Sequence, residues 1–144
     1  MAHPLRYPVT RHRPDLPPDL TVREERARLS GPGLSAFFKI MGLWAVRDED
    51  ARALLGGVTN GPFYEMKRAP GKLLDADRLT RISYLIGIFK GLRILHGDAL
   101  ADQWVQLPNQ NPMFGGQTPL AYMIRGGLPA MQTVRRLVDA RRAG

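Results

Sequence analysis

The segment from Ala51 to Arg68 reads ARALLGGVTNGPFYEMKR, and it carries two helical patterns separated by a short turn. The first pattern follows three acidic residues, 48–50, which favour a helix N-terminus, and it ends at Gly56-Gly57. The second pattern begins at Thr59 or Asn60, either of which is a good N-cap. Because so few residues join the two helices, the spacing predicts a helix-turn-helix unit.

A helix-turn-helix unit needs a small residue where its helices cross, a glycine that can adopt a positive φ, and apolar residues beneath both helices. In this segment Ala53 fits the crossing and Gly57 fits the turn. The apolar residues that we assign to the buried side are Val58, Phe63 and Met66.

The opposite side of the second helix carries four residues that suit a nucleic-acid surface: Asn60, Tyr64, Lys67 and Arg68. We assign Lys67 and Arg68 to phosphate groups, and Asn60 or Tyr64 to base edges. The segment Gly61-Pro62 counts against sequence-specific readout, because the first turn of a recognition helix normally supplies base contacts. The alternative is an αα-hairpin that serves packing alone.

Helical patterns continue on both sides of this unit, and no strand-like alternation appears, so the predicted fold class is all-α. Upstream, apolar residues recur at spacings of three and four from Leu34 to Trp44. Downstream, a long helix opens near 75–77 and ends at His96-Gly97, and its wide apolar stripe predicts the central element of the core. A short helix from Leu120 to Arg125, with Thr118 as its N-cap and Gly126 at its end, and a last helix from Pro129 follow.

The chain of 144 residues is expected to form a helical bundle with three parts. Residues 1–30 hold five of the twelve prolines, and we expect an extended Pro/Arg-rich arm with a short helix near 22–29. Residues 31–97 form the helix-turn-helix-like and dimerisation module. Residues 98–144 form a small helical C-terminal domain.

The formal charge of the chain is +8, and half of this excess lies in the last twenty residues. Residues 125–144 carry five arginines and one aspartate, whereas residues 1–30 and 31–124 each have a net charge of +2. A basic chain suits a polyanionic partner or an acidic protein surface. The position of the charge therefore favours a protein partner at least as strongly as DNA.

Several classes of function are not expected from this composition. The chain has no cysteine, its three histidines are scattered, and no nucleophile, acid and base are placed together, so we expect no catalytic site, metal or cofactor. No apolar run is long enough to span a membrane, and the first ten residues lack the apolar core of a signal peptide. We therefore expect a cytoplasmic protein with no membrane partner.

The C-terminal part carries a fixed order of motifs: 104–109 (WVQLPN), 114–120 (FGGQTPL) and Arg125-Gly126-Gly127. Together with 54–59 (LLGGVT) and 81–90 (RISYLIGIFK), these motifs resemble the Xre/MbcA/ParS antitoxins, with the strongest likeness to ParS. The resemblance covers about residues 34–144. It implies an Xre-like helix-turn-helix module followed by a toxin-binding domain.

The resemblance also implies a role in a type II toxin–antitoxin pair. The partner would be a RES-domain toxin that acts on NAD, either by degrading it or by using it for ADP-ribosylation. The antitoxin would not be an enzyme and would lay its C-terminal domain across the NAD cleft of the toxin. Many relatives also bind and repress their own promoter, and we expect a homodimer within a toxin–antitoxin hetero-oligomer.

The candidate toxin-binding residues lie in the basic C-terminal segment, where arginines can pair with carboxylates through two hydrogen bonds. They are Arg125, Gly126, Gly127, Leu128, Arg135, Arg136, Arg141 and Arg142. A solvated basic helix end is the plainer explanation, because cations complement a helix C-terminus. A stand-alone helix-turn-helix regulator with a helical dimerisation domain is the alternative function.

Overall fold

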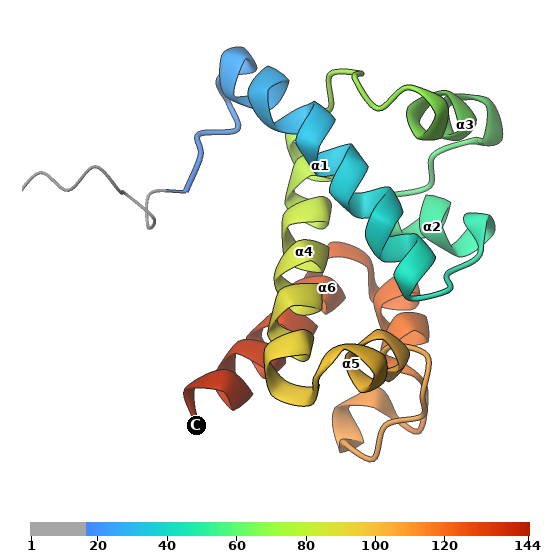
Figure 1. Cartoon of the computed structure of the whole chain (residues 1–144), viewed down its shortest axis with the longest axis vertical. Helices are drawn as coiled ribbons and strands as arrows, with labels where there is room; N and C mark the ends of the chain where they lie inside the picture. The colour runs from blue at the N-terminus through green and yellow to red at the C-terminus, as the bar shows by residue number, and fades with distance from the viewer. Residues whose placement is uncertain (1–16) are drawn as a thin grey trace, which may run out of the picture.

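A computed structural model describes residues 17–144, and every regular element among them is helical (Figure 1). In chain order the elements are α1 (Arg23–Leu43), α2 (Asp48–Leu54), α3 (Asn60–Arg68), α4 (Ala76–His96), α5 (Asp98–Trp104), the 3-10 turn η1 (Pro112–Phe114) and α6 (Pro119–Ala143). The predicted all-α fold class is confirmed. The first sixteen residues of the expected arm lie outside the described residues.

The long helix α4 is the central element, as its wide apolar stripe predicted. It packs against α1, α5 and α6, and Figure 1 shows α1 crossing in front of it. Its first turn is capped by Asp75, whose side chain accepts a hydrogen bond of 2.8 Å from the backbone N–H of Arg78. The helix ends at Gly97, which has a φ of 73°.

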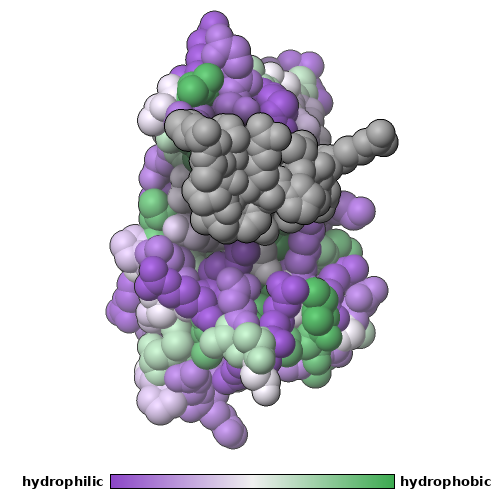
Figure 2. Space-filling view, turned by 90° about the vertical axis from the view of Figure 1, so that its left-hand side faces the viewer, coloured by the Kyte–Doolittle hydropathy of each residue, from purple (hydrophilic) through white to green (hydrophobic). Residues whose placement is uncertain are grey.

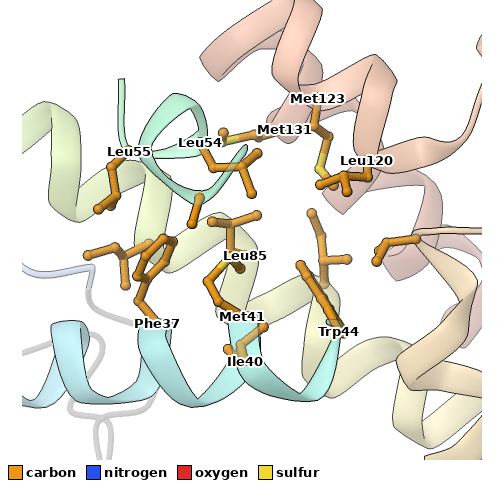
Figure 3. Close-up of a cluster of buried hydrophobic side chains, with 14 of the residues drawn as sticks. Phe37, Ile40, Met41, Trp44, Leu54, Leu55, Leu85, Leu120, Met123 and Met131 are labelled. Atoms are coloured by element: carbon orange, nitrogen blue, oxygen red, sulfur yellow. The ribbon is translucent and has the colours of Figure 1, made fainter. Parts of the chain in front are cut away.

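A single hydrophobic core joins the helices from α1 to α6. Figure 3 shows Phe37 and Trp44 of α1 on one side of it, and Leu54 of α2 with Met123 and Met131 of α6 on the other. The parts expected at residues 31–97 and 98–144 therefore share one core.

Helix α1 corrects the expectation of a short helix followed by a second one from Leu34. The helix is continuous from Arg23 to Leu43, although Pro32 lies inside it. Residues 23–30, which we expected to belong to the N-terminal arm, are part of this helix. Pro32 is exposed and gives up only one backbone donor, whereas Ser30, Leu34 and Phe37 are buried along one side of the helix. Packing on both sides of the proline therefore outweighs its local cost.

The buried hydroxyl of Ser30 fixes α1 to the loop before α4. Its Oγ donates to the carbonyl of Arg26 at 2.6 Å and accepts from the backbone N–H of Leu74 at 2.9 Å. Ser30 is the only buried polar residue among residues 17–144, and its hydroxyl acts both as a hydrogen-bond donor and as an acceptor.

The turn between α2 and α3 has the expected geometry. Gly57 has a φ of 90°, and the residues predicted for the buried side, Val58, Phe63 and Met66, are buried. The fully buried alanine of α2 is Ala51, whereas Ala53, expected at the crossing, is only half-buried.

The C-terminal helix α6 consists of two helical segments joined at Gly127, where φ is 66° and ψ is −146°. The break was expected at Gly126 and lies one residue later. The predicted N-cap is confirmed, because the side chain of Thr118 accepts a hydrogen bond of 3.1 Å from the N–H of Ala121. The short elements α5 and η1 were not predicted.

Arg93 holds α5 against the end of α4. Its Nη2 donates to Asp102 at 2.6 Å, and its guanidinium carbon lies 4.5 Å from the centroid of the Phe89 ring. The hydrogen bond to Asp102 raises the pKa of Arg93. The start of the C-terminal segment is thus tied to the central helix.

Candidate functional site

The four residues assigned to DNA lie on the exposed side of α3. Asn60, Tyr64, Lys67 and Arg68 are all exposed, whereas Phe63 and Met66 of the same helix are buried. The arrangement has the two-sided character that was predicted for this helix. DNA binding by this face stays a prediction.

Both cations of this face already have acidic partners. The Nζ of Lys67 lies 3.1 Å from Oδ1 of Asp48, and Nη2 of Arg68 lies 2.7 Å from Oε2 of Glu65. These ion pairs are exposed, so they can exchange for phosphate contacts at small cost. They nevertheless lower the positive potential that α3 presents to a polyanion.

The five arginines of the C-terminal segment differ in their surroundings. Arg135 is paired: its Nε lies 3.0 Å from Asp139, and its Nη1 donates to the carbonyl of Ser83 at 3.5 Å. The other four are exposed and have no ion-pair partner among residues 17–144. They are Arg125, Arg136, Arg141 and Arg142. The segment therefore presents free guanidinium donors, and Arg135 is the least available of its cations.

The glycines predicted to touch a toxin have structural reasons to be glycine. A Cβ at Gly126 would lie 2.5 Å from the Cβ of Ala130, and Gly127 has a positive φ with a ψ that side chains rarely adopt. Leu128, next to them, is partly buried. Toxin contact by these three residues stays a prediction.

A groove of about 610 Å³ lies between the loop that follows α5 and the end of α6. Trp104 and Leu107 supply apolar surface, and Arg141 supplies a guanidinium group. Sequence reasoning assigned the loop only to turns, because nothing in the spacing shows that residue 141 returns to residue 107. The Asn-Gln-Asn segment 109–111 was the one available signal.

Two asparagines shape this loop with their side-chain oxygens. Oδ1 of Asn109 accepts from the N–H of Asn111 at 2.9 Å, and Oδ1 of Asn111 accepts from the N–H of Met113 at 3.1 Å. A bond from an asparagine side-chain oxygen to the backbone N–H two residues later stabilises a turn. The loop wall of the groove is therefore ordered by its own side chains.

The surface of the molecule is mixed in character on the face that Figure 2 presents. Figure 2 shows mostly hydrophilic side chains on the face that it presents, with apolar patches among them in the lower half. Among the apolar residues of the described chain, Ile94 and Leu100 are well exposed. Scattered apolar surface with many charges is compatible with a polar protein interface.

Other kinds of site find no support in the described part of the chain. Within residues 17–144 no three histidines or acidic residues lie close enough to hold a metal ion. None of the helices in that range combines the length and the apolarity that a bilayer crossing requires.

Comparison with known proteins gives the family. Residues 91–144 match the family described as the antitoxin Xre/MbcA/ParS C-terminal toxin-binding domain. This range begins in the last part of α4 and contains the four free arginines and the groove. The chain is also similar to the uncharacterized protein y4oB of Sinorhizobium fredii, with 37% identity over 112 residues, which are 77% of this chain and 84% of that protein.

No solved structure matches the chain. The family match nevertheless covers the whole C-terminal segment, and the helical fold agrees with the one that the sequence motifs implied. The chain therefore belongs to the Xre/MbcA/ParS antitoxins, the antitoxin members of toxin–antitoxin systems.

Proposed function

We propose that this antitoxin neutralises a RES-domain toxin that consumes NAD, as an NADase or an ADP-ribosyltransferase, by covering the active site of the toxin. The observation that carries the proposal is the set of four arginines without ion-pair partners among residues 17–144, all inside the matched toxin-binding domain. In this role the chain regulates catalysis by its partner in the cytoplasm and performs none itself.

The second segment of α6 is built to hold such donors in place. Met131, Val134 and Val138 are buried against the core, and the exposed Arg141 and Arg142 follow one turn later. A helix anchored in this way loses little conformational freedom when its end meets a partner. The guanidinium groups are thus offered from a rigid support.

Arginine chemistry fits the proposed target. A guanidinium group forms two parallel hydrogen bonds to a carboxylate or a phosphate, and it stays charged at any physiological pH. A cleft that binds and cleaves a dinucleotide needs polar groups around the phosphates and ribose, and carboxylates among them would pair with Arg136, Arg141 or Arg142. Occupation by the antitoxin would then exclude NAD.

The test is coexpression with a RES-domain toxin, with growth and cellular NAD as readouts. Wild-type antitoxin should restore both, and the double variant Arg141→Gln, Arg142→Gln should restore neither fully. The matched control is Lys39→Gln, which removes an exposed charge from α1. Lys39 has no ion-pair partner among residues 17–144. Failure of the wild-type chain to bind the toxin or to restore growth would reject the proposal.

A deletion from Leu128 onward is a poor test of this mechanism. It would remove Met131, Val134 and Val138 from the core, so loss of protection would report unfolding. Removal of residues 141–144 alone spares these core residues, because all four are exposed. This shorter truncation separates toxin contact from stability.

We propose autorepression as a second activity, with antitoxin chains paired as a homodimer on promoter DNA. The exposure of all four predicted residues on one side of α3 supports it. A stand-alone transcriptional regulator would bind DNA without any toxin, so toxin binding by the purified chain distinguishes the two functions.

A further inference from the structure

We propose that the groove between the 105–112 loop and the end of α6 is the docking site for an acidic segment of the toxin. The inference rests on the proposed function and goes further, because it extends the contact from Arg141 to a groove beside it and names the chemistry of that groove and the kind of toxin segment that it receives. The groove lies wholly inside the matched toxin-binding domain.

Two side-chain amides of the groove wall have a defined direction. A backbone N–H can only donate, so the bonds to Met113 and to Asn111 require that the side-chain oxygens of Asn111 and Asn109 face the loop. The NH₂ groups of both asparagines therefore point away from these bonds. Neither NH₂ has a hydrogen-bond partner among residues 17–144.

Arg141 supplies the positive charge of the groove. It lines the same groove, it is exposed, and within the described chain it has neither a carboxylate partner nor a hydrogen bond. The residues that line the groove thus include one guanidinium group and two amides whose NH₂ groups have no partner among residues 17–144, while the asparagine oxygens accept bonds within the loop. A surface with an excess of donors and one positive charge complements an anionic acceptor such as a carboxylate.

Apolar surface lies in the same groove as these donors. Leu107 is 43% exposed and lines the groove with Trp104, whose ring packs edge-on against Phe114 at a centroid distance of 6.1 Å. Free nucleotides and DNA phosphates have no apolar side chain that could pack against Leu107. A peptide segment that carries both an acidic and an apolar side chain uses the donors and Leu107 together, so the occupant is a segment of the protein partner.

The chain supplies a nearly isosteric test of this proposal. Asn109→Asp and Asn111→Asp retain the oxygen that accepts the loop N–H but replace the free NH₂ donor with a negatively charged acceptor. Arg141→Gln removes the cation. Lys39→Gln on α1 is the control for a lost charge, and equal thermal midpoints show that each variant is folded.

The affinity of the full chain for its RES-domain partner is measured for each variant as a function of salt. The double variant Asn109→Asp, Asn111→Asp and the variant Arg141→Gln should each weaken binding by about 10- to 100-fold, with a smaller salt dependence for Arg141→Gln. Lys39→Gln should change it less than about twofold. Wild-type affinity in both groove variants, or loss of DNA binding instead of toxin binding, would overturn the inference.

A second measurement keeps this inference separable from the proposed function. The full chain is labelled with ¹⁵N and titrated with hexaglutamate, with hexalysine as the control. The side-chain NH₂ signals of Asn109 and Asn111, identified by their disappearance in the aspartate variants, should shift with hexaglutamate alone. Shifts absent with hexaglutamate would overturn the groove assignment even if the toxin is neutralised, whereas shifts present without toxin binding would reject only the RES-domain partner.

Discussion

The guanidinium group of Arg135 on α6 occupies the space that a side chain at Gly87 on α4 would fill. One turn further along α4, Gly91 leaves room for Val138 in the same way. The two glycines therefore let α6 approach the central helix closely. The neighbours differ, because one is the flexible end of a long side chain and the other is a buried β-branched residue.

Gly91→Ala should destabilise the fold by about 1–3 kcal/mol, because Val138 cannot move away from the added methyl group without displacing α6. Urea unfolding followed by circular dichroism measures the change. A variant as stable as the wild type would show that α6 shifts freely on α4.

Gly87→Ala should be tolerated far better than Gly91→Ala. Here only the end of Arg135 has to swing aside, and alanine improves the helix propensity of the position. Gly42→Ala is the matched control, because an added Cβ there meets nothing within 4 Å, and we expect it to stabilise α1 by about 0.5–1 kcal/mol. Equal large losses at positions 87 and 91 would contradict the distinction.

Ser30→Ala should cost about 1–3 kcal/mol, because it leaves the buried N–H of Leu74 without its acceptor. Thr80→Ala is the matched control. The Thr80 hydroxyl also donates to a carbonyl four residues earlier, that of Ala76, but there the bond is exposed. We expect a change within about 0.5 kcal/mol for Thr80→Ala in the same unfolding assay.

Gly127→Ala should destabilise the chain by about 1–3 kcal/mol, since its φ of 66° and ψ of −146° fall in a region that only glycine adopts readily. Gly127→Ala should also weaken toxin binding, because the junction at Gly127 sets the direction of the second segment of α6, which carries the arginines. Gly61→Ala, at a position with open space around it, serves as the control. A Gly127→Ala protein that is as stable as the wild type and binds the toxin equally well would show that the backbone conformation at Gly127 is not required.

The ion pair between Lys67 and Asp48 gives a gain-of-function test for DNA binding. Asp48→Asn releases the Lys67 ammonium group and removes a negative charge from the edge of the α3 face, so it should tighten promoter binding. Lys67→Ala with Arg68→Ala should weaken binding and flatten its salt dependence. Gel shifts at several salt concentrations measure both effects. Unchanged binding in both variants would show that DNA does not contact α3.

Much of this architecture could be predicted from periodicity and capping alone. Asp75 and Thr118 begin their helices as expected, and Val58, Phe63 and Met66 lie beneath the helix-turn-helix unit. These features depend on residues close in sequence. Local patterns therefore suffice for them.

The errors arose where distant residues decide the outcome. A short helix near 22–29 and a second one from Leu34 were expected, but burial of Ser30 and Leu34 on one side of α1 keeps the helix continuous through Pro32. Arg135 appeared equivalent to its neighbours, but Gly87 and Asp139 engage it. The groove beside Arg141 is lined by segments about thirty residues apart, and sequence spacing cannot reveal that they lie on the same groove.

The single core shared by α1 through α6 has a consequence for the lifetime of the antitoxin in the cell. A shared core favours cooperative unfolding of all the helices, so a partner bound to the C-terminal segment would stabilise every helix by mass action. Degradation by proteases requires opened chains, so toxin bound at one end would protect the opposite end from cleavage as well. The abundance of the antitoxin would then follow the amount of its toxin without any change in synthesis.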